Sequence, residues 1–339
     1  MTAWQQNYPR ADLAHLPTPL EPMPRLRQAL GARAPLYVKR DDCTGLATGG
    51  NKVRQLEFYL GEALAQGADR LLITGAVQSN YVRTAAGAAA KLGLACTVQI
   101  EERVKEVDAL YRESGNVLLE QLLGADIHYF PEGEDEVGAD ASIEALAAAA
   151  RAAGERPYVI HLSESPRPLG ALGYVVAAAE LMAQAAAMDM DVGTVVLASG
   201  SAVTHAGMLV GLRALGHDGI RVEGGCVRRA AELQAPRVLR VVRQVEKLIG
   251  AEGVVSDDDV HVNDTVLGGG YGKIHASTRE AMTMGARLEG LLLDPVYSAK
   301  ALAAAIAWIR EHDPRRAVVF VHTGGLPSLF AYGRKIFGE

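Results

Sequence analysis

The chain of 339 residues alternates short apolar runs with longer, alanine-rich runs. The short runs favour β-strands, and the longer runs place apolar residues at helical spacing. Predicted helices lie at 53–64, 79–92, 115–123, 140–153 and 169–187, and predicted strands at 36–39, 71–74, 95–100, 127–130, 158–161, 194–198, 221–226, 290–293 and 317–321. Such alternation is typical of parallel sheets with helices on both faces.

This pattern predicts an α/β fold with two domains, each an open, mostly parallel sheet flanked by helices. Residues 53–160 are expected to form a small domain, and residues 1–52 with 161–339 a larger one. In open α/β sheets, ligands bind beyond the carboxyl ends of the strands. The turns that follow the predicted strands are therefore where we expect functional residues.

Composition argues against several classes of protein. The net charge is −6 and aromatic residues make up 5% of the chain, so a nucleic-acid binder is not expected. Arg228-Arg229 and the acidic run Glu132–Glu136 are expected to be solvated. No apolar run suits a membrane span or a signal peptide, which predicts a cytoplasmic protein without a membrane partner.

Three widely spaced cysteines form no CxxC motif, so no metal site is predicted. Cys96 and Cys226 lie in predicted strands and are expected to be buried. Cys43 lies in a polar turn, where a structural role is favoured over a reactive one.

Gly49-Gly50-Asn51-Lys52 lies at the start of the predicted helix 53–64. Two glycines allow another group to approach the backbone closely. The positive helix N-terminus and partial burial lower the pKa of a lysine amine, and a neutral amine forms Schiff bases with carbonyl compounds. Lys52 is thus a candidate nucleophile, although a surface lysine after a turn is the simpler explanation of these four residues alone.

Two further turns have the composition of anion sites. Residues 75–81 contain Ser79 and Asn80 at a predicted helix start, where they either cap the helix or hold a substrate carboxylate. Residues 199–204 are mostly small or hydroxyl-bearing and join a strand to a helix, which suits a phosphate. The turn matches neither a Walker A motif nor GxGxxG, so a dinucleotide is not expected.

Three other turns offer hydroxyl groups. Thr323 follows the strand 317–321, Tyr271 lies in a glycine-rich loop, and Tyr297 follows the predicted strand 290–293. The turns together match pyridoxal 5′-phosphate (PLP), because they offer a Schiff-base lysine, a phosphate turn, a carboxylate site and a hydroxyl for a ring nitrogen. A non-catalytic PLP-binding protein and a nucleotide-binding α/β protein without PLP remain as alternatives.

The ordered motifs resemble the D-cysteine desulfhydrase and 1-aminocyclopropane-1-carboxylate (ACC) deaminase family of fold-type II PLP enzymes. The resemblance covers nearly the whole chain. It rests on Leu16–Leu20, Lys39-Arg40-Asp41-Asp42, Gly49-Gly50-Asn51-Lys52 and His322–Gly325. It implies a homodimer that acts on a small amino acid, with PLP in the cleft between the two domains.

The resemblance also implies a role for each matching residue. Lys52 would form the Schiff base with PLP and, once freed, take the Cα proton. Asn80 would contact the phenolic oxygen of PLP, and Thr323 the pyridine nitrogen. Ser79, Asn80 and Tyr81 would bind the substrate. The remaining residues are the proposed proton carriers Tyr271 and Tyr297 and the proposed phosphate site Gly200, Ser201, Ala202, Val203 and Thr204.

Several positions depart from the family pattern. Val203 replaces a glycine in the phosphate turn, and a β-branched residue resists positive φ. Tyr81 stands where desulfhydrases have His and ACC deaminases Gln, and Ser298 where ACC deaminases have Glu. The 163–168 segment is unusual, and its Glu164 and Arg167 are either substrate-selecting or solvated.

The implied reaction is β-elimination from a small amino acid with a sulfur leaving group. It most resembles D-cysteine desulfhydrase, which gives pyruvate, ammonia and sulfide. L-cysteate sulfo-lyase is an alternative, with Arg167 as a candidate for binding the sulfonate. ACC deaminase is a further alternative, which Ser298 weakens, and β-replacement is more distant.

Overall fold

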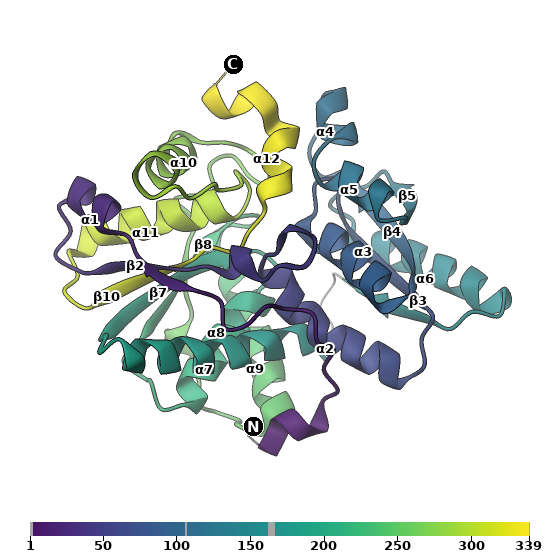
Figure 1. Ribbon diagram of the computed structural model, residues 1–339, viewed down its shortest axis with the longest axis horizontal. Helices are drawn as coiled ribbons and strands as arrows, with labels where there is room; N and C mark the ends of the chain where they lie inside the picture. The colour runs from purple at the N-terminus through teal and green to yellow at the C-terminus, as the bar shows by residue number, and fades with distance from the viewer. Residues whose placement is uncertain (1–2, 106, 162–166, 339) are drawn as a thin grey trace.

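The computed structural model describes residues 3–105, 107–161 and 167–338, and it contains two sheets flanked by helices (Figure 1). The larger sheet has the strand order β1-β2-β10-β7-β8-β9. Only the β1–β2 pair is antiparallel. The strands are β1 (Leu20–Pro22), β2 (Leu36–Lys39), β7 (Val192–Ser199), β8 (Arg221–Cys226), β9 (His261–Asn263) and β10 (Ala317–Val321).

The smaller sheet is entirely parallel and has the order β5-β4-β3-β6. Its strands are β3 (Arg70–Ala76), β4 (Ala95–Glu101), β5 (Asp126–Phe130) and β6 (Pro157–Ile160). Because β3 and β4 are neighbours, with Ala76 paired to Glu101, the turns that follow them lie side by side. The predicted α/β class with two mostly parallel sheets is confirmed, while the domain boundaries at 52/53 and 160/161 stay a prediction.

Helices cover both faces of each sheet. They are α1 (Pro24–Leu30), α2 (Asn51–Ala65), α3 (Asn80–Leu92), α4 (Ala109–Glu113), α5 (Asn116–Leu122), α6 (Glu136–Ala152), α7 (Leu172–Ala187), α8 (Val203–Ala214), α9 (Ala231–Ile249), α10 (Ala276–Glu289), α11 (Ser298–His312) and α12 (Leu326–Tyr332). One predicted strand is wrong: residues 290–293 form no strand in the described chain, and Gly290 ends α10 in the left-handed conformation with φ of 69°. Leu291 and Leu293 are apolar because they pack against α10 and α11.

The core of the larger sheet follows the two-residue period of its strands. Val319 and Val321 of β10 face α7, α8 and α9, whereas Val318 and Phe320 face α10 and α11. The segment Leu169–Ala187, which includes α7, has the length and composition of a membrane span. It packs inside the protein, where Tyr174 and Leu181 are fully buried, so its apolar character reflects the core of the fold.

Helix α2 packs on both sheets. Val53, Leu56 and Leu60 pack with Leu71 and Ile73 of the smaller sheet. The opposite side of the helix carries Arg54, which is fully buried and belongs to an ion network on the side of the larger sheet.

In this network, Arg54 binds Asp41 through Nε at 3.1 Å and Nη2 at 2.9 Å, and Glu180 of α7 through Nη1 at 3.0 Å and Nη2 at 2.8 Å. Lys39 of β2 donates to the same Glu180, and the Tyr174 hydroxyl donates to Asp41 at 2.6 Å. Removing one partner of such a network leaves the others charged and buried. The start of α2 is therefore held firmly to α7 and β2.

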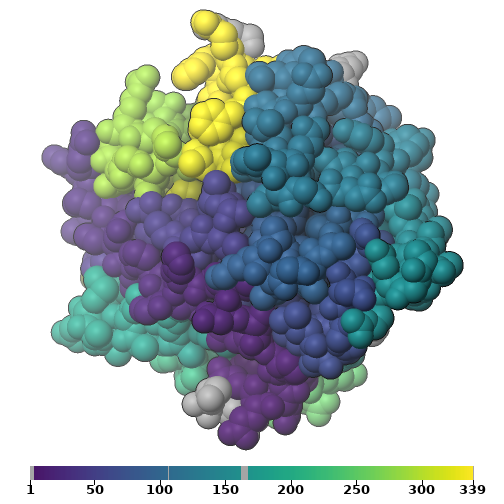
Figure 2. Space-filling model, turned by 45° about the vertical axis from the view of Figure 1, so that its right-hand side comes forward, coloured from purple at the N-terminus to yellow at the C-terminus, as the bar shows by residue number. Residues whose placement is uncertain are grey.

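The two parts of the molecule also meet near the C-terminus. Tyr332 of α12 packs edge-on against Tyr111 of α4, with ring centroids 5.5 Å apart. Figure 2 shows the C-terminal segment, in yellow, lying directly against the blue segment that includes α4. This contact closes one side of the space between the sheets.

Candidate active site

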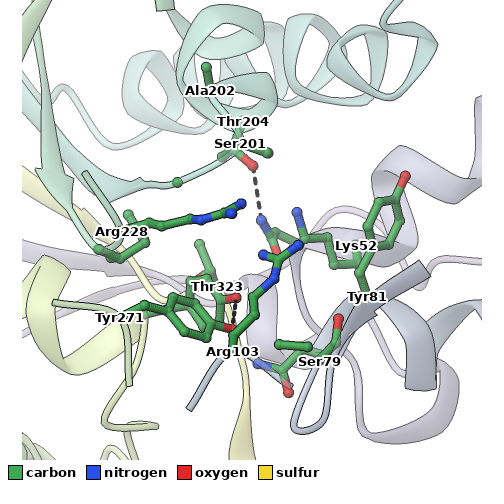
Figure 3. A pocket seen from close by; sticks show the side chains of 18 of the residues that line it. Lys52, Ser79, Tyr81, Arg103, Ser201, Ala202, Thr204, Arg228, Tyr271 and Thr323 are labelled. Atoms are coloured by element: carbon green, nitrogen blue, oxygen red, sulfur yellow. Dashed lines mark hydrogen bonds between the residues drawn. The ribbon is translucent and has the colours of Figure 1, made fainter. Parts of the chain in front are cut away.

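A pocket of about 890 Å³ lies between the two sheets, at the carboxyl ends of their strands. All the predicted site residues except Val203 line it: Lys52, Ser79, Asn80, Tyr81, Gly200, Ser201, Ala202, Thr204, Tyr271, Tyr297 and Thr323 (Figure 3). The structure thus brings together six chain segments that are far apart in the sequence.

Lys52 lies in the first turn of α2. Burial lowers the pKa of its amine from 10.5 to about 8. The recorded contacts of Nζ are a 3.2 Å hydrogen bond to Gln55 Oε1 and the face of the Tyr81 ring, 4.7 Å from its centroid. Neither contact carries a negative charge, so the environment favours the neutral, nucleophilic amine.

The glycines before Lys52 permit a close approach of two loops. Gly50 has φ of 112°, and a Cβ atom added to it would lie 3.0 Å from the carbonyl oxygen of Thr323. The same oxygen accepts a hydrogen bond from Asn51 N at 3.1 Å. Because Gly50 has no side chain, the turn that carries Lys52 can lie directly against the turn that carries Thr323.

The 199–204 turn joins β7 to α8, and no side chain caps the helix start. The residue with positive φ is Ala202, at 75°, whereas Val203 is the first residue of α8. Val203 is therefore compatible with the turn, because it has helical backbone and does not need positive φ. The Val203 side chain packs against the core, and its backbone N–H belongs to the uncapped first turn of α8.

Thr204 connects this turn to α2. Its Oγ1 accepts hydrogen bonds from Asn51 Nδ2 and from Gln55 Nε2, both at 2.9 Å. A threonine hydroxyl has two acceptor lone pairs and one donor hydrogen. With both lone pairs used, its hydrogen is left to donate to an anion in the pocket.

The turn after β3 behaves as the sequence predicts. Ser79 caps α3 by accepting from Val82 N at 3.3 Å. Asn80 Oδ1 accepts from Asn116 Nδ2 at 3.0 Å, which leaves the Asn80 amide hydrogens as donors. The same turn therefore presents polar donors to the pocket while its serine stabilises the helix.

Two tyrosines line the other side of the pocket. The hydroxyl groups of Tyr271 and Tyr297 lie 2.6 Å apart, and either can donate. Burial raises the pKa of both, so both are neutral near pH 7. Nearby Arg103 and Arg228 partly offset the rise in the pKa of Tyr271.

Four arginines that line the pocket were not predicted from the sequence: Arg103, Arg228, Arg229 and Arg237. The expectation that Arg228-Arg229 is solvated is wrong, since the Arg228 side chain is only 10% exposed. The acidic run 132–136 is also not simply solvated, because Glu136 pairs with Arg228 at 2.5 Å and with Arg229 at 2.6 Å. The missed signal was position: Arg103 follows β4 and Arg228 follows β8, where ligand sites are expected.

Other singled-out residues lie elsewhere. Arg167 pairs with Glu62 at 2.9 Å and lines a separate cavity rather than this pocket. Glu164 lies outside the described residues. Ser298 is buried and donates to Asp294 at 2.6 Å. Cys96 and Cys226 are buried as expected, and Cys43 is exposed, with its pKa raised by partial burial and by Asp42.

The fold and the site define a class of α/β enzyme that binds an aldehyde cofactor through a lysine and its phosphate at a helix start. The family model described as "Pyridoxal-phosphate dependent enzyme" matches residues 11–324. The chain therefore belongs to this family.

Curated relatives include D-cysteine desulfhydrases of Salmonella choleraesuis (strain SC-B67), 42% identical, and Salmonella typhi, 41% identical. Each alignment spans 327 residues and 96% of both chains. A solved structure described as an ACC deaminase homologue superposes with a TM-score of 0.88 at 32% identity, over 99% of this chain and 98% of the other. O-ureido-L-serine synthase, at 18% identity and a TM-score of 0.67, covers 95% of this chain and 92% of its own and shares the fold.

The described residues fit PLP. The uncapped start of α8 and the free hydrogen of the Thr204 hydroxyl suit a phosphate, and the Lys52 amine of lowered pKa suits an aldehyde. The Thr323 hydroxyl lines the same pocket as Lys52 and suits a ring nitrogen, and the oriented Asn80 amide is available for the phenolic oxygen. The chain is a PLP-dependent enzyme, and these residue assignments are developed below.

Proposed function

We propose that the enzyme catalyses β-elimination from a small amino acid with a sulfur leaving group, most like a D-cysteine desulfhydrase. The observation that carries this proposal is the Lys52 amine, whose pKa is lowered to about 8, in one pocket with a phosphate turn and a carboxylate turn. Similarity to D-cysteine desulfhydrases over 96% of the chain supports the same activity. The products would be pyruvate, ammonia and the released sulfur group.

Bound PLP supplies an electron sink for the electron pair left when the substrate Cα loses its proton. Gly200, Ser201, Ala202, Val203 and Thr204 would hold its phosphate, Asn80 its phenolic oxygen and Thr323 its ring nitrogen. Thr323 offers a neutral hydroxyl in place of a carboxylate. A neutral partner does not hold the ring nitrogen protonated, which favours early loss of a β leaving group.

Lys52 would act twice, first as the covalent attachment point and then as the base for the Cα proton. A pKa near 8 lets the amine exchange protons close to neutral pH. Ser79, Asn80 and Tyr81 would hold the substrate carboxylate with side-chain and backbone donors at the start of α3. The Tyr271–Tyr297 pair would pass a proton to the departing group, because both hydroxyls are neutral and share a hydrogen bond.

The first test is pyruvate release from D-cysteine, L-cysteine, L-cysteate and ACC by the PLP-loaded enzyme, assayed in parallel. We expect pyruvate from a substrate with a sulfur group on Cβ, and no turnover by Lys52→Ala, which also loses the visible absorbance of lysine-bound PLP. Formation of 2-oxobutanoate from ACC alone would overturn β-elimination in favour of ring opening. Normal turnover by Lys52→Ala would disprove the role of Lys52.

We further propose a homodimer in the cytoplasm, by analogy with the family and from the composition. Sedimentation velocity of the purified enzyme tests the dimer. A monomer at micromolar concentration would contradict it.

A further inference from the structure

The pocket contains more positive charge than a single carboxylate requires. Arg103, Arg228, Arg229 and Arg237 all line it. Arg103 follows β4 of the smaller sheet, while the other three follow β8 of the larger sheet or lie on α9. Figure 3 shows the guanidinium groups of Arg103 and Arg228 extending from different walls toward the centre of the pocket.

Within the described chain, Arg228, Arg229 and Arg237 share the carboxylate of Glu136, whereas Arg103 has a carboxylate partner of its own. Arg103 binds Glu101 through Nε at 2.9 Å and Nη2 at 2.6 Å. Arg228 and Arg229 share Glu136, and the other partner of Arg228, Glu134, is 72% exposed and so strongly screened by solvent. The Arg228 side chain is nine-tenths buried, and within the described chain its Nε has no hydrogen-bond partner.

A consistent sign comes from Arg229. Burial, together with the charges of Arg228 and Arg237, lowers its pKa to about 10 despite the opposing effect of Glu136. A guanidinium whose pKa falls in this way lies in an environment that is short of negative charge. An additional anion in the pocket would relieve that shortage.

The four arginines are distinct from the phosphate turn (residues 199–204) and from the carboxylate turn (residues 75–81). The phosphate turn has its own donors in the uncapped start of α8 and in Thr204. Ala76, three residues before Ser79, pairs with Glu101, two residues before Arg103, so Arg103 lies beside the carboxylate turn. Arg103 and Arg228 both act on the pKa of Tyr271, which places the two cations near the tyrosine pair.

We propose that Arg103 and Arg228 bind an oxyanion carried on the substrate Cβ, so that the preferred substrates are amino acids with a sulfonate, sulfate or phosphate at that carbon. This inference rests on the β-elimination proposed above and extends its sulfur leaving group to other oxyanions, including phosphate. Guanidinium groups are suited to such groups because they offer several donors in one plane.

The reaction needs no oxidant or reductant. The Cα proton goes to the base, and the bond from Cβ to the oxyanion group breaks with its electron pair, which leaves on that group. The remaining aminoacrylate takes up one water and gives pyruvate and ammonium. A sulfonate substrate thus yields hydrogen sulfite, and sulfate or phosphate esters yield the corresponding inorganic anion.

The test uses anions without an amine, which cannot react with the cofactor. Binding of 3-sulfopropanoate, 3-phosphonopropanoate and propanoate to the PLP-loaded enzyme is measured by calorimetry. We expect at least one dianion to bind ten or more times more tightly than propanoate. Arg103→Gln and Arg228→Gln should each reduce that preference at least fivefold while changing the Kd of propanoate less than twofold. Arg310→Gln is the matched control, since Arg310 is 52% exposed and pairs with Glu280.

Equal affinity for propanoate and both dianions would overturn the proposal. A parallel rise in the Kd of PLP in both variants, measured by absorbance titration, would also overturn it, because the arginines would then hold the cofactor phosphate.

Turnover distinguishes this inference from the proposed reaction. Pyruvate from cysteate, O-phosphoserine or O-sulfoserine at a higher kcat/KM than from D-cysteine supports both proposals. Pyruvate from D-cysteine without any preference for dianions would support the elimination and disprove the oxyanion site. Dianion binding that depends on the arginines, without pyruvate from any substrate, would support the oxyanion site and disprove the elimination.

Discussion

Replacing Lys52 with methionine should stabilise the cofactor-free protein while abolishing its activity. The shift of the Lys52 pKa from 10.5 to about 8 corresponds to ~3 kcal/mol against the charged amine. The side chain is only partly buried, and solvent screening reduces this to about 1–3 kcal/mol. At about 2 °C per kcal/mol, Lys52→Met should raise Tm by roughly 2–6 °C at pH 7.

The pH dependence has a defined sign. The folded-state pKa of Lys52 lies below its unfolded value, so the unfolded chain binds more protons between about pH 8 and pH 10.5. Wild-type stability should therefore rise relative to Lys52→Met across this window. The advantage of the variant should be full below pH 8 and disappear by about pH 10.5.

Urea denaturation of the cofactor-free proteins at several pH values measures this difference. Lys300 provides a matched contrast, because burial also lowers its pKa to about 8. Its amine, however, donates to the carbonyl oxygens of Leu267 and Gly270 at 2.7 and 2.9 Å. Lys300→Met should thus destabilise the protein by about 1–3 kcal/mol, since it leaves both acceptors without that donor. Equal stability of Lys52→Met and wild type at pH 7, or a difference that grows with pH, would refute the reasoning.

Three further predictions concern the pocket. Tyr271→Phe removes the 2.6 Å hydrogen bond to Tyr297 and should lower kcat about 10–100-fold with little change in KM; steady-state kinetics showing an unchanged kcat would exclude a proton-transfer role. Ala202→Val forces a β-branched residue to φ of 75° and should raise the Kd of PLP roughly tenfold or more, whereas Val203→Gly should change it less than about twofold. Absorbance titration in which Val203→Gly weakens PLP binding more than Ala202→Val would contradict the geometry of the turn. Glu136→Gln should destabilise the enzyme by about 1–3 kcal/mol at pH 7. Burial alone would raise the pKa of Glu136, but the arginines around it lower that pKa below 4.5. Denaturation curves should therefore show the full stability difference between wild type and variant above about pH 4.5, and a smaller one as the pH falls. A stability difference that does not change with pH would exclude the ion pairs as its cause.

The sequence predicted the elements that depend on local pattern. The helix that begins after Ser79 and the strand 221–226 were both predictable, because caps and apolar periodicity are local signals. The error at 290–293 has the same origin, since a loop that buries Leu291 and Leu293 has the same apolar pattern as a strand. Strands of three residues, such as β9, carry too little pattern to be found.

Site residues that belong to a local sequence motif were predictable. Those that depend on a partner far away in the chain were missed. Lys52 and the 199–204 turn follow from their own sequences. Arg228 could not be distinguished from a solvated arginine, because its burial depends on Glu136, which lies 92 residues away in the chain. The two alternatives for Arg167 could not be separated from the sequence for the same reason, since its partner Glu62 lies far away in the chain.

The ion network of Arg54, Asp41 and Glu180 determines which part of the pocket is stationary. Lys52 precedes Arg54 by two residues, so the network fixes the lysine in the same frame of reference as Thr323 and the phosphate turn. The Ser79 turn and Arg103 belong to the other sheet. Any hinge motion between the sheets would therefore move the substrate-binding groups, and Asn80 with them, relative to Lys52, Thr323 and the phosphate turn. It would change the fit for the amino acid without displacing the lysine from its aldehyde.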